Sequence, residues 1–452
     1  MSRIAALTLV GAALAGSAWP SAAFAQEQEQ SGPASLVSEV RLKTDVERLV
    51  AFGTRHTLSS TDDPRRGIGA ARRWTENRFR KLARECGGCL QVALPETVET
   101  GDRLPHPAKI VNVLAVQRGT ERPNEVVIIA GHIDSRASDV MDATSDAPGA
   151  NDDGSGTVAV LEAARVLSRE RLPTTIVYAV LSGEEQGLFG GKLLANYAKA
   201  QGWVVKAMLN NDIIGNSRGS DGTVDAGSVR VFSEGSRADG DDALRAAAYR
   251  EGGENDSPSR NLSRWLDALA DRSGIGIDVR QIFRADRSGR GGDHLPMLAA
   301  GYSAVRFSVG VENYQHQHQD VRTENGIDYG DLPEVMDFAY LAKVARLNVA
   351  ALAALARAPM PPAPMASGAV DINTTLAWHA VPGAQSYRVY RRATDARDWS
   401  ALASVDGDVT GYVAKGIRID DWVFGVSSVA SDGSESPVAS AIPGGAFHPT
   451  AE

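Results

Sequence analysis

One stretch decides the fold of this chain: Glu125-Val126-Val127-Ile128-Ile129-Ala130-Gly131-His132-Ile133-Asp134-Ser135. Its first residues form a nearly continuous apolar run, which is typical of a strand buried on both faces of a parallel or mixed sheet. A histidine and an aspartate follow where the strand ends. Open α/β sheets place their functional sites at the carboxyl ends of their strands. We therefore expect further functional residues at the ends of neighbouring strands.

Strands and helices alternate on both sides of this stretch. Further strands are expected over residues 109–116, 175–181, 206–211 and 301–309, and helices over 156–169, 187–201 and 332–356. Residues 35–90 have mostly helical spacing, and the polar, glycine-containing residues 221–258 suggest a long surface excursion. The alternation predicts an α/β fold, a three-layer sandwich around a mixed, mostly parallel central sheet, over residues 35–357.

A change of composition marks a second domain. Residues 358–366 are rich in proline and predict a semi-rigid linker. Residues 367–447 then show short strands separated by turns, which predicts an all-β sandwich. Its run from Leu376-Ala377-Trp378 through Val381-Pro382-Gly383 to Tyr387 resembles a fibronectin type III domain. No catalytic set occurs in it. We expect a module that contacts a surface or polymer, with a removable pro-segment as the alternative.

The N-terminus has the pattern of an export signal. Arg3 precedes the apolar run 4–16, and Ala23-Phe24-Ala25 offers a small-x-small cleavage site. Residues 1–25 are therefore expected to be a signal peptide that sends the chain to the periplasm or the medium, with a core helix as the alternative. No later stretch holds the ~20 uninterrupted apolar residues of a membrane span.

Charge and cysteine content limit the partners and the compartment. The 452 residues carry 56 acidic and 47 basic side chains, a net charge of −9 that argues against nucleic acid as a main partner. The two cysteines, Cys86 and Cys89, are expected to form a structural disulfide in an exported protein. A redox site would place the pair at the start of a helix, and a zinc knuckle would need two more ligands nearby.

A glycine-rich segment carries the second group of polar residues: Pro148-Gly149-Ala150-Asn151-Asp152-Asp153-Gly154-Ser155-Gly156-Thr157. It opens an expected helix, where acids ordinarily serve as caps, and capping is the favoured interpretation of Asp153. Asp152 is the candidate metal ligand, and the glycines allow the backbone to pass close to the site. The spacing of the acids does not fit a calcium-binding EF-hand.

Three more strand ends carry candidate ligands. Glu184 and Glu185 are adjacent, so one can bind a metal while the other faces a reacting water; the alternative is a helix N-terminus that favours acids. Asp212 ends another strand, where a turn aspartate is the ordinary alternative. His316 and His318 stand two apart on an extended segment and point in opposite directions, so only one is expected to face a metal.

Taken together and in this order, the five groups resemble the bacterial two-zinc aminopeptidase family, whose relatives include glutamate carboxypeptidase. The resemblance covers roughly residues 35–355. It implies that two Zn²⁺ ions are bound on either side of a bridging Asp152 by the ligand set His132, Asp152, Glu185, Asp212 and His318. It also implies Glu184 as the general base and Asp134 as the support of His132.

Two histidines leave alternatives within this resemblance. Measured from Glu312-Asn313-Tyr314, His318 matches the last ligand of the family, whereas measured from Asp320 the match is His316; we favour His318. His294, in a segment that also resembles the family, is expected to be structural or to face the substrate rather than to bind a metal.

The resemblance implies a secreted, zinc-dependent exopeptidase that acts on peptides, an aminopeptidase as the first choice. A metal pair would activate water and polarise the scissile carbonyl, and Glu184 would move the proton. A carboxypeptidase or another amidohydrolase is the alternative, since a carboxypeptidase needs pocket arginines and the chain offers Arg284, Arg287, Arg290 and Arg306. A catalytically inactive binding protein is disfavoured by the intact Glu184 and the full ligand set.

Overall fold

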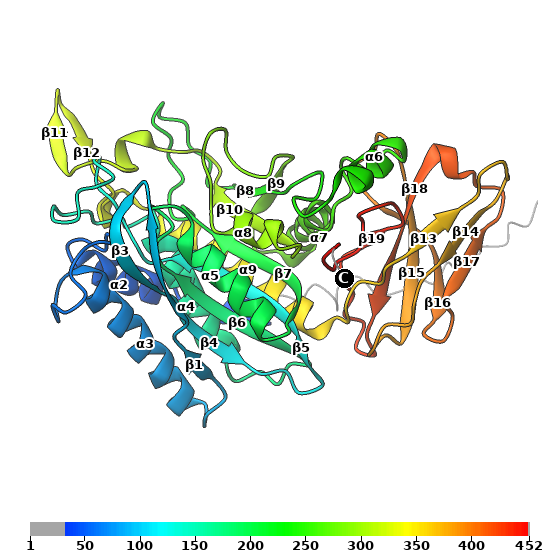
Figure 1. Ribbon diagram of the computed structural model, residues 1–452, viewed down its shortest axis with the longest axis horizontal. Helices are drawn as coiled ribbons and strands as arrows, with labels where there is room; N and C mark the ends of the chain where they lie inside the picture. Colours follow the sequence, from blue (N-terminus) through cyan, green and yellow to red (C-terminus); the bar gives the residue numbers. More distant parts are fainter. Residues whose placement is uncertain (1–31, 451–452) are drawn as a thin grey trace, which may run out of the picture.

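The central sheet has eight strands in the order β1-β4-β6-β5-β7-β10-β8-β9 (Figure 1). The computed structural model describes residues 32–450, so the predicted signal peptide lies outside the described residues. The strands are β1 (Gln91–Ala93), β4 (Val113–Gln117), β5 (Arg122–His132), β6 (Thr174–Leu181), β7 (Val204–Asn211), β8 (Ser228–Phe232), β9 (Asp278–Ile282) and β10 (Ala304–Val309). The middle strands β6, β5, β7 and β10 run parallel, and antiparallel pairs flank them. The predicted mixed sheet is confirmed.

The register of these parallel strands positions the site. His132 at the end of β5 is paired with Leu181 at the end of β6. On the other side of β5, Ala130 is paired with Asn210 of β7. The segments that follow β5, β6 and β7 therefore leave the sheet at one edge, as parallel strands require.

Helices cover both faces of the sheet. One face packs against α2 (Glu39–Val50), α3 (Gly67–Glu85), α4 (Gly154–Leu167), α7 (Pro258–Ser273) and α9 (Phe338–Arg357), and the other against α5 (Phe189–Ala200) and α8 (His294–Ala299). This confirms the three-layer sandwich. Among the described helices, α9 alone is long and apolar enough to cross a membrane, but most of it is buried against the sheet and α4, as in a core helix of a globular domain.

Two sequence-based expectations about the strands were wrong. Residues 109–116 form two strands, because the chain turns at the buried Asn112, whose side chain donates to the carbonyl of Gly190 and accepts from the N–H of Ser182. The first of the two, β3 (Leu104–Val111), pairs instead with β2 (Glu96–Gly101) as a hairpin. Residues 221–258 are a surface excursion only in part, because they include β8 of the central sheet, whereas α6 (Asp242–Arg250) has no buried residue. β8 is short and is flanked by polar and glycine-containing residues, so no long apolar run marks it.

The C-terminal part is all-β, as predicted. One antiparallel sheet contains β13 (Met365–Ser367), β14 (Thr374–Ala377) and β17 (Gly411–Ala414), and the other contains β15 (Ser386–Ala393), β16 (Ser400–Asp406), β18 (Trp422–Val429) and β19 (Ala439–Ser440). Leu376, Trp378, Tyr387 and Phe424 belong to the core of this part. Strand β13 begins within the last residues of the predicted linker.

Buried polar contacts join the two parts of the molecule. Asp256, fully buried in front of α7, forms an ion pair with Arg392 of β15 and accepts a hydrogen bond from Ser440 of β19. Figure 1 shows α6 and α7 next to the C-terminal sheets, on the side of the molecule away from α2 and α3. The C-terminal sheets are thus docked on the α/β part.

The remaining elements are short. A hairpin of β11 (Arg322–Glu324) and β12 (Ile327–Tyr329) and four 3-10 helices, η1 (Pro33–Leu36), η2 (Tyr314–His316), η3 (Pro333–Val335) and η4 (Ile419–Asp421), complete the described chain. Cys86 and Cys89 form a disulfide directly after α3, which confirms the predicted bond.

Candidate metal centre

Five of the predicted site residues converge at the edge where β5, β6 and β7 end. His132, Asp152 and Asp212 bring ligand atoms within 4.8 Å of one another, and so do Asp152, Glu185 and His318. Asp152 is common to both groups. One of its carboxylate oxygens lies 3.3 Å from Nε2 of His132, and the other lies 2.9 Å from Nε2 of His318. The two oxygens of Asp152 therefore face two different sets of ligands, as a bridging carboxylate must.

Backbone contacts fix His132 at the end of β5. Its N–H donates to the carboxylate of Asp153 at 3.0 Å, and the carbonyl oxygen of Asp134 lies 3.1 Å from Nδ1. The carboxylate of Asp134 is farther from that nitrogen, at 3.7 Å. A proton held on Nδ1 by these oxygens leaves the lone pair of Nε2 directed at the candidate metal position.

Asp134 also holds the loop that carries the two glutamates. Its fully buried carboxylate accepts hydrogen bonds from the N–H groups of Gly183 and Glu185, at 2.9 and 3.0 Å, and from the hydroxyl of Thr57. Burial by itself would raise the pKa of Asp134, but the hydrogen bonds and the nearby His132 outweigh it, so the pKa is lowered. Asp134 therefore stays ionised and supports both sides of the site.

The loop of Asp152 is held by residues that the sequence analysis missed. The carboxylate of Asp331 accepts hydrogen bonds from the N–H groups of Asn151 and Asp152, at 2.8 and 2.7 Å. The guanidinium of the buried Arg55 donates to the carbonyl of Gly149 at 2.8 Å. Asp331 stands just before an expected helix, where it looks like any capping acid, and nothing in the sequence around Arg55 marks it.

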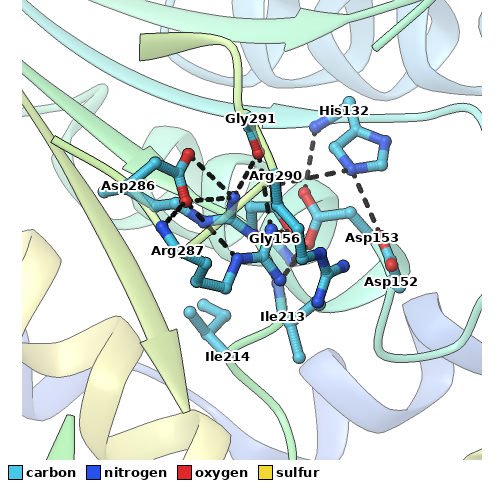
Figure 2. A network of polar contacts seen from close by, with 12 residues as sticks. His132, Asp152, Asp153, Gly156, Ile213, Ile214, Asp286, Arg287, Arg290 and Gly291 are labelled. Carbon is cyan, nitrogen blue, oxygen red and sulfur yellow. Dashed lines mark hydrogen bonds and ion pairs between the residues drawn. The ribbon is translucent and has the colours of Figure 1, made fainter. Parts of the chain in front are cut away.

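Asp153 serves as a helix cap, as the sequence suggested. Its side chain accepts a hydrogen bond from the N–H of Gly156 at 2.9 Å at the start of α4. Because it also accepts from the N–H of His132, the cap connects α4 to the end of β5. Figure 2 shows these contacts beside Asp152.

The fit of the site to metal ions rests on unpaired buried atoms. Among the described residues, Nε2 of His132 and Oε1 of Glu185 are buried and have no hydrogen-bond partner. Buried polar atoms normally have hydrogen-bond partners, so we expect these two atoms to bind a ligand. Imidazole nitrogens combined with carboxylate oxygens are a donor set that suits zinc. Both ligand groups therefore fit a zinc ion, with Asp152 shared.

Of the two candidate histidines, the structure brings His318 to the site. Its Nε2 lies 3.1 Å from Glu185 as well as 2.9 Å from Asp152, and its backbone is left-handed, with φ of 53°. His316 lies in η2, with Nδ1 3.0 Å from the carbonyl oxygen of Gly330, and belongs to neither ligand group. His294 is fully buried at the start of α8, where its Nε2 lies 2.8 Å from the carbonyl oxygen of Ala285.

Asp212, at the end of β7, has a buried arginine as its partner. Nη2 of Arg306 in β10 lies 2.7 Å from one oxygen of Asp212, while the other oxygen lies 3.9 Å from Nε2 of His132. Arg306 was expected as a possible pocket arginine, but it is fully buried beneath the site. Because Arg306 pairs with one oxygen of Asp212, the other oxygen is left for a metal.

A cavity of about 460 Å³ opens over the ligands. Its lining includes the partly buried Glu184, together with Asp152, Glu185, Asp212 and His318. Burial raises the pKa of Glu184 well above its usual range. A carboxyl group that holds a proton readily, next to a metal position, suits acid–base chemistry.

Arginines form the other wall of this cavity. Arg287 and Arg290 line it, as does Arg103 from the turn between β2 and β3, whereas Arg284 does not. Figure 2 shows Arg287 and Arg290 beside Asp286 and Gly291, across from His132.

This fold and this site define a class of protein, the metal-dependent peptidases, and similarity to known proteins agrees with that class. The chain belongs to Peptidase family M28, whose profile matches residues 112–341. A probable zinc metalloprotease of the fungus Leptosphaeria maculans is 42% identical over 93% of this chain and 98% of that protein. One from Pyrenophora teres f. teres is 41% identical over 95% of this chain and 91% of its own length. These relatives are fungal, whereas the predicted resemblance was to a bacterial family.

Solved structures with this fold include enzymes of two kinds. The Legionella pneumophila LapA aminopeptidase superposes with a TM-score of 0.53 at 20% identity, over 73% of this chain and 75% of that one. Porphyromonas gingivalis glutaminyl cyclase gives a TM-score of 0.50 at 17% identity, over 70% and 98%. At this identity the likeness establishes the fold alone.

Proposed function

We propose that this chain is a zinc-dependent exopeptidase, an aminopeptidase as the first choice, that removes N-terminal residues from peptides. The observation that carries the proposal is the pair of ligand groups that share Asp152. The names of the fungal relatives support zinc and proteolysis, and the LapA aminopeptidase shares the fold.

The two ligand groups support a position for each of two metal ions. One ion would be held by His132, Asp152 and Asp212, and the other by Asp152, Glu185 and His318. When bound, zinc ions lower the pKa of water and polarise a carbonyl group. Asp134 keeps His132 and the loop of Glu185 in place, so the ligands are preorganised by the fold.

Glu184 is the proposed proton carrier. Its carboxylate lines the cavity without belonging to either ligand group. In the reaction it takes a proton from the attacking water as the water oxygen bonds to the carbonyl carbon. It then delivers that proton to the nitrogen of the leaving amine as the scissile C–N bond breaks. A catalytically inactive binding protein would have no need for a free carboxylate at this position.

A second candidate is a carboxypeptidase or another amidohydrolase on the same scaffold. The arginines of the cavity favour it, because a guanidinium recognises a terminal carboxylate. The two candidates differ in what they need from the substrate: an aminopeptidase requires a free α-amine, and a carboxypeptidase requires a free C-terminus.

We also propose that the protein is exported and that its C-terminal sheets, which resemble a fibronectin type III domain in sequence, contact a surface or a polymer. The N-terminal segment supports export. Fractionation of cells that express the full chain tests this: mature protein beginning near Gln26 outside the cytoplasm is expected, and full-length protein inside the cytoplasm would contradict it.

A pair of chromogenic substrates tests the reaction. The zinc-loaded protein is expected to hydrolyse free aminoacyl anilides, to leave the N-acetylated forms intact, and to lose activity with a chelator. Hydrolysis of N-blocked peptides only at a free C-terminus would favour the carboxypeptidase. Activity that survives complete removal of the metal would contradict both.

A further inference from the structure

Arg287 and Arg290, called the arginine wall below, line the cavity. They belong to a cluster in which guanidinium groups outnumber carboxylates. Arg230, Arg287 and Arg290 share Glu312, with nitrogen–oxygen distances of 2.6, 3.6 and 3.0 Å. Asp286 is in turn shared by Arg287 and by Arg306. Arg306 also pairs with Asp212, so three carboxylates serve four guanidinium groups in a largely buried cluster.

Arg287 shows the imbalance most clearly. Its side chain is only 8% exposed, and Nη1 is buried without a hydrogen-bond partner among the described residues. A carboxylate oxygen of Glu312 lies 3.6 Å from this nitrogen, beyond hydrogen-bond reach. Leaving a buried charged donor unpaired is costly, so this nitrogen calls for an anionic ligand.

The ligand must come through the cavity. Arg287 and Arg290 line the same space as Glu184 and the metal ligands, and Arg103 and Arg136 line it from two other segments. Two bound cations would neutralise the carboxylates of the ligand groups but not the guanidinium groups. The cavity of the loaded protein is therefore positively charged beside the reacting bond.

We propose that this arginine wall is a subsite for a carboxylate of the substrate, held by Arg287 and Arg290, so that the enzyme selects acidic peptides. The inference rests on the proposed peptidase function and adds the substrate class. A guanidinium fork matches a carboxylate in shape and charge. The carboxylate can come from an acidic side chain of the terminal residue or from the C-terminus of a short peptide.

Paired substrates distinguish the two sources. For the side-chain source, glutamyl and glutaminyl anilides are compared, because they differ only in a carboxylate. For the C-terminal source, an N-acetylated dipeptide with a free carboxylate is compared with its amide. In at least one pair the acidic member is expected to have a kcat/KM about 10- to 100-fold higher. Equal rates within both pairs would overturn the proposal.

Substitutions test whether Arg287 and Arg290 cause the preference for acidic substrates. Arg290→Gln and Arg287→Gln are each expected to reduce the acidic-to-neutral ratio of kcat/KM about tenfold or more, mainly through KM. Arg284→Gln, an equal charge change on an exposed residue of the same segment outside the cavity, is expected to keep the wild-type ratio. Melting temperatures show whether each variant is folded, and Arg290, at 28% exposed, tolerates replacement more easily than Arg287. A ratio that stays unchanged in a folded Arg290→Gln variant would contradict the subsite.

A binding measurement separates this inference from the proposed function. Calorimetry with glutarate on the zinc-loaded protein is expected to show binding that weakens at least tenfold in Arg290→Gln and not in Arg284→Gln. If glutarate binds in this way but no peptide is hydrolysed, the subsite stands and the peptidase function fails. If peptides are hydrolysed but glutarate binds equally to all variants, the subsite fails alone.

Discussion

Asp152 is the residue on which the site depends, because each of its carboxylate oxygens faces a different ligand group. Its position is set by contacts of the backbone: the N–H of Asp152 donates to Asp331, and the carbonyl of Gly149 accepts from Arg55. The side chain is thereby left free for cations. The same arrangement explains why Asp153, its neighbour, is a cap and not a ligand.

Replacing Glu184 separates metal binding from turnover. Because Glu184 lies in the cavity but in neither ligand group, Glu184→Gln is expected to keep its zinc and to lose roughly 10²–10⁴-fold in kcat, the usual contribution of a general acid–base. Metal analysis and kinetics on the same preparation check this. Full activity in the variant would remove Glu184 from the mechanism.

Glu234 makes the stability of the protein depend on pH. Burial raises the pKa of Glu234 from 4.5 to about 8 in the folded protein. The folded state therefore binds a proton more tightly than the unfolded state, and this contribution to stability is present at low pH and is lost as the pH rises through about 8. Between pH 5.5 and 8.5 the wild type is expected to lose about 3 kcal/mol relative to Glu234→Gln.

Urea unfolding of both proteins at the two pH values measures this difference. Using the difference between variant and wild type cancels the effect of pH on the metal centre, since Glu234 belongs to neither ligand group. Parallel pH profiles for the two proteins would contradict the burial of an ionisable Glu234.

The sequence reveals the candidate metal ligands better than the residues that hold those ligands in position. Four of the five metal-ligand candidates stand close to the end of a strand or the start of a helix, so a local pattern locates them. Asp331 and Arg55 hold the loop of Asp152 from 179 and 94 residues away. Their partners are distant along the chain, and no local pattern indicates such pairs.

The start of α4 packs so closely against the ends of β5 and β7 that the contact has no room for side chains. A Cβ on Gly156 would lie 2.3 Å from the carbonyl oxygen of Asn211, and one on Gly131 would lie 2.5 Å from the backbone of Gly156. This close approach brings the loop of Asp152 to the ends of the strands.

Gly156→Ala is therefore expected to destabilise the fold by at least about 1–3 kcal/mol and to weaken zinc binding, because the helix must move away from β7. Thermal unfolding and zinc titration measure both effects. Gly227→Ala is the matched control, since a Cβ there meets nothing within 4 Å. Equal stability and zinc affinity in the two variants would contradict the role assigned to this contact.

The prediction of elements succeeded where apolar runs are long and failed where they are short. β5 and β6 are buried on both faces and were found from composition alone. β8 alternates buried and partly exposed residues around Arg230, and the edge strand β9 carries only one buried residue, so both strands were missed.

The whole molecule is one folded unit, because the C-terminal sheets are joined to the α/β part by buried contacts. Asp256 is fully buried and has Arg392 and Ser440 as partners across the contact. Deleting residues 358–452 removes these partners together with Ala439 and Phe447, which pack into the core cluster of the α/β part, and exposes the apolar surface that they cover.

The truncated protein is expected to melt at least about 5 °C below the full chain, and its soluble fraction is expected to hydrolyse small substrates, since the cavity is lined by the α/β part only. Calorimetry and an activity assay on both proteins check this. An unchanged melting temperature would show that the sheets are an independent module. The sequence indicated the second domain through its proline-rich linker but contained no sign of this contact.

Metal analysis shows whether one chain binds two cations around Asp152. The zinc content of the protein is measured after dialysis, by mass spectrometry, for the wild type and for Asp152→Asn. Two zinc ions per wild-type chain are expected, and the variant is expected to lose both or to show a sharp fall in the affinity for both. One zinc or none in the wild type, or two in Asp152→Asn with unchanged affinity, would contradict it.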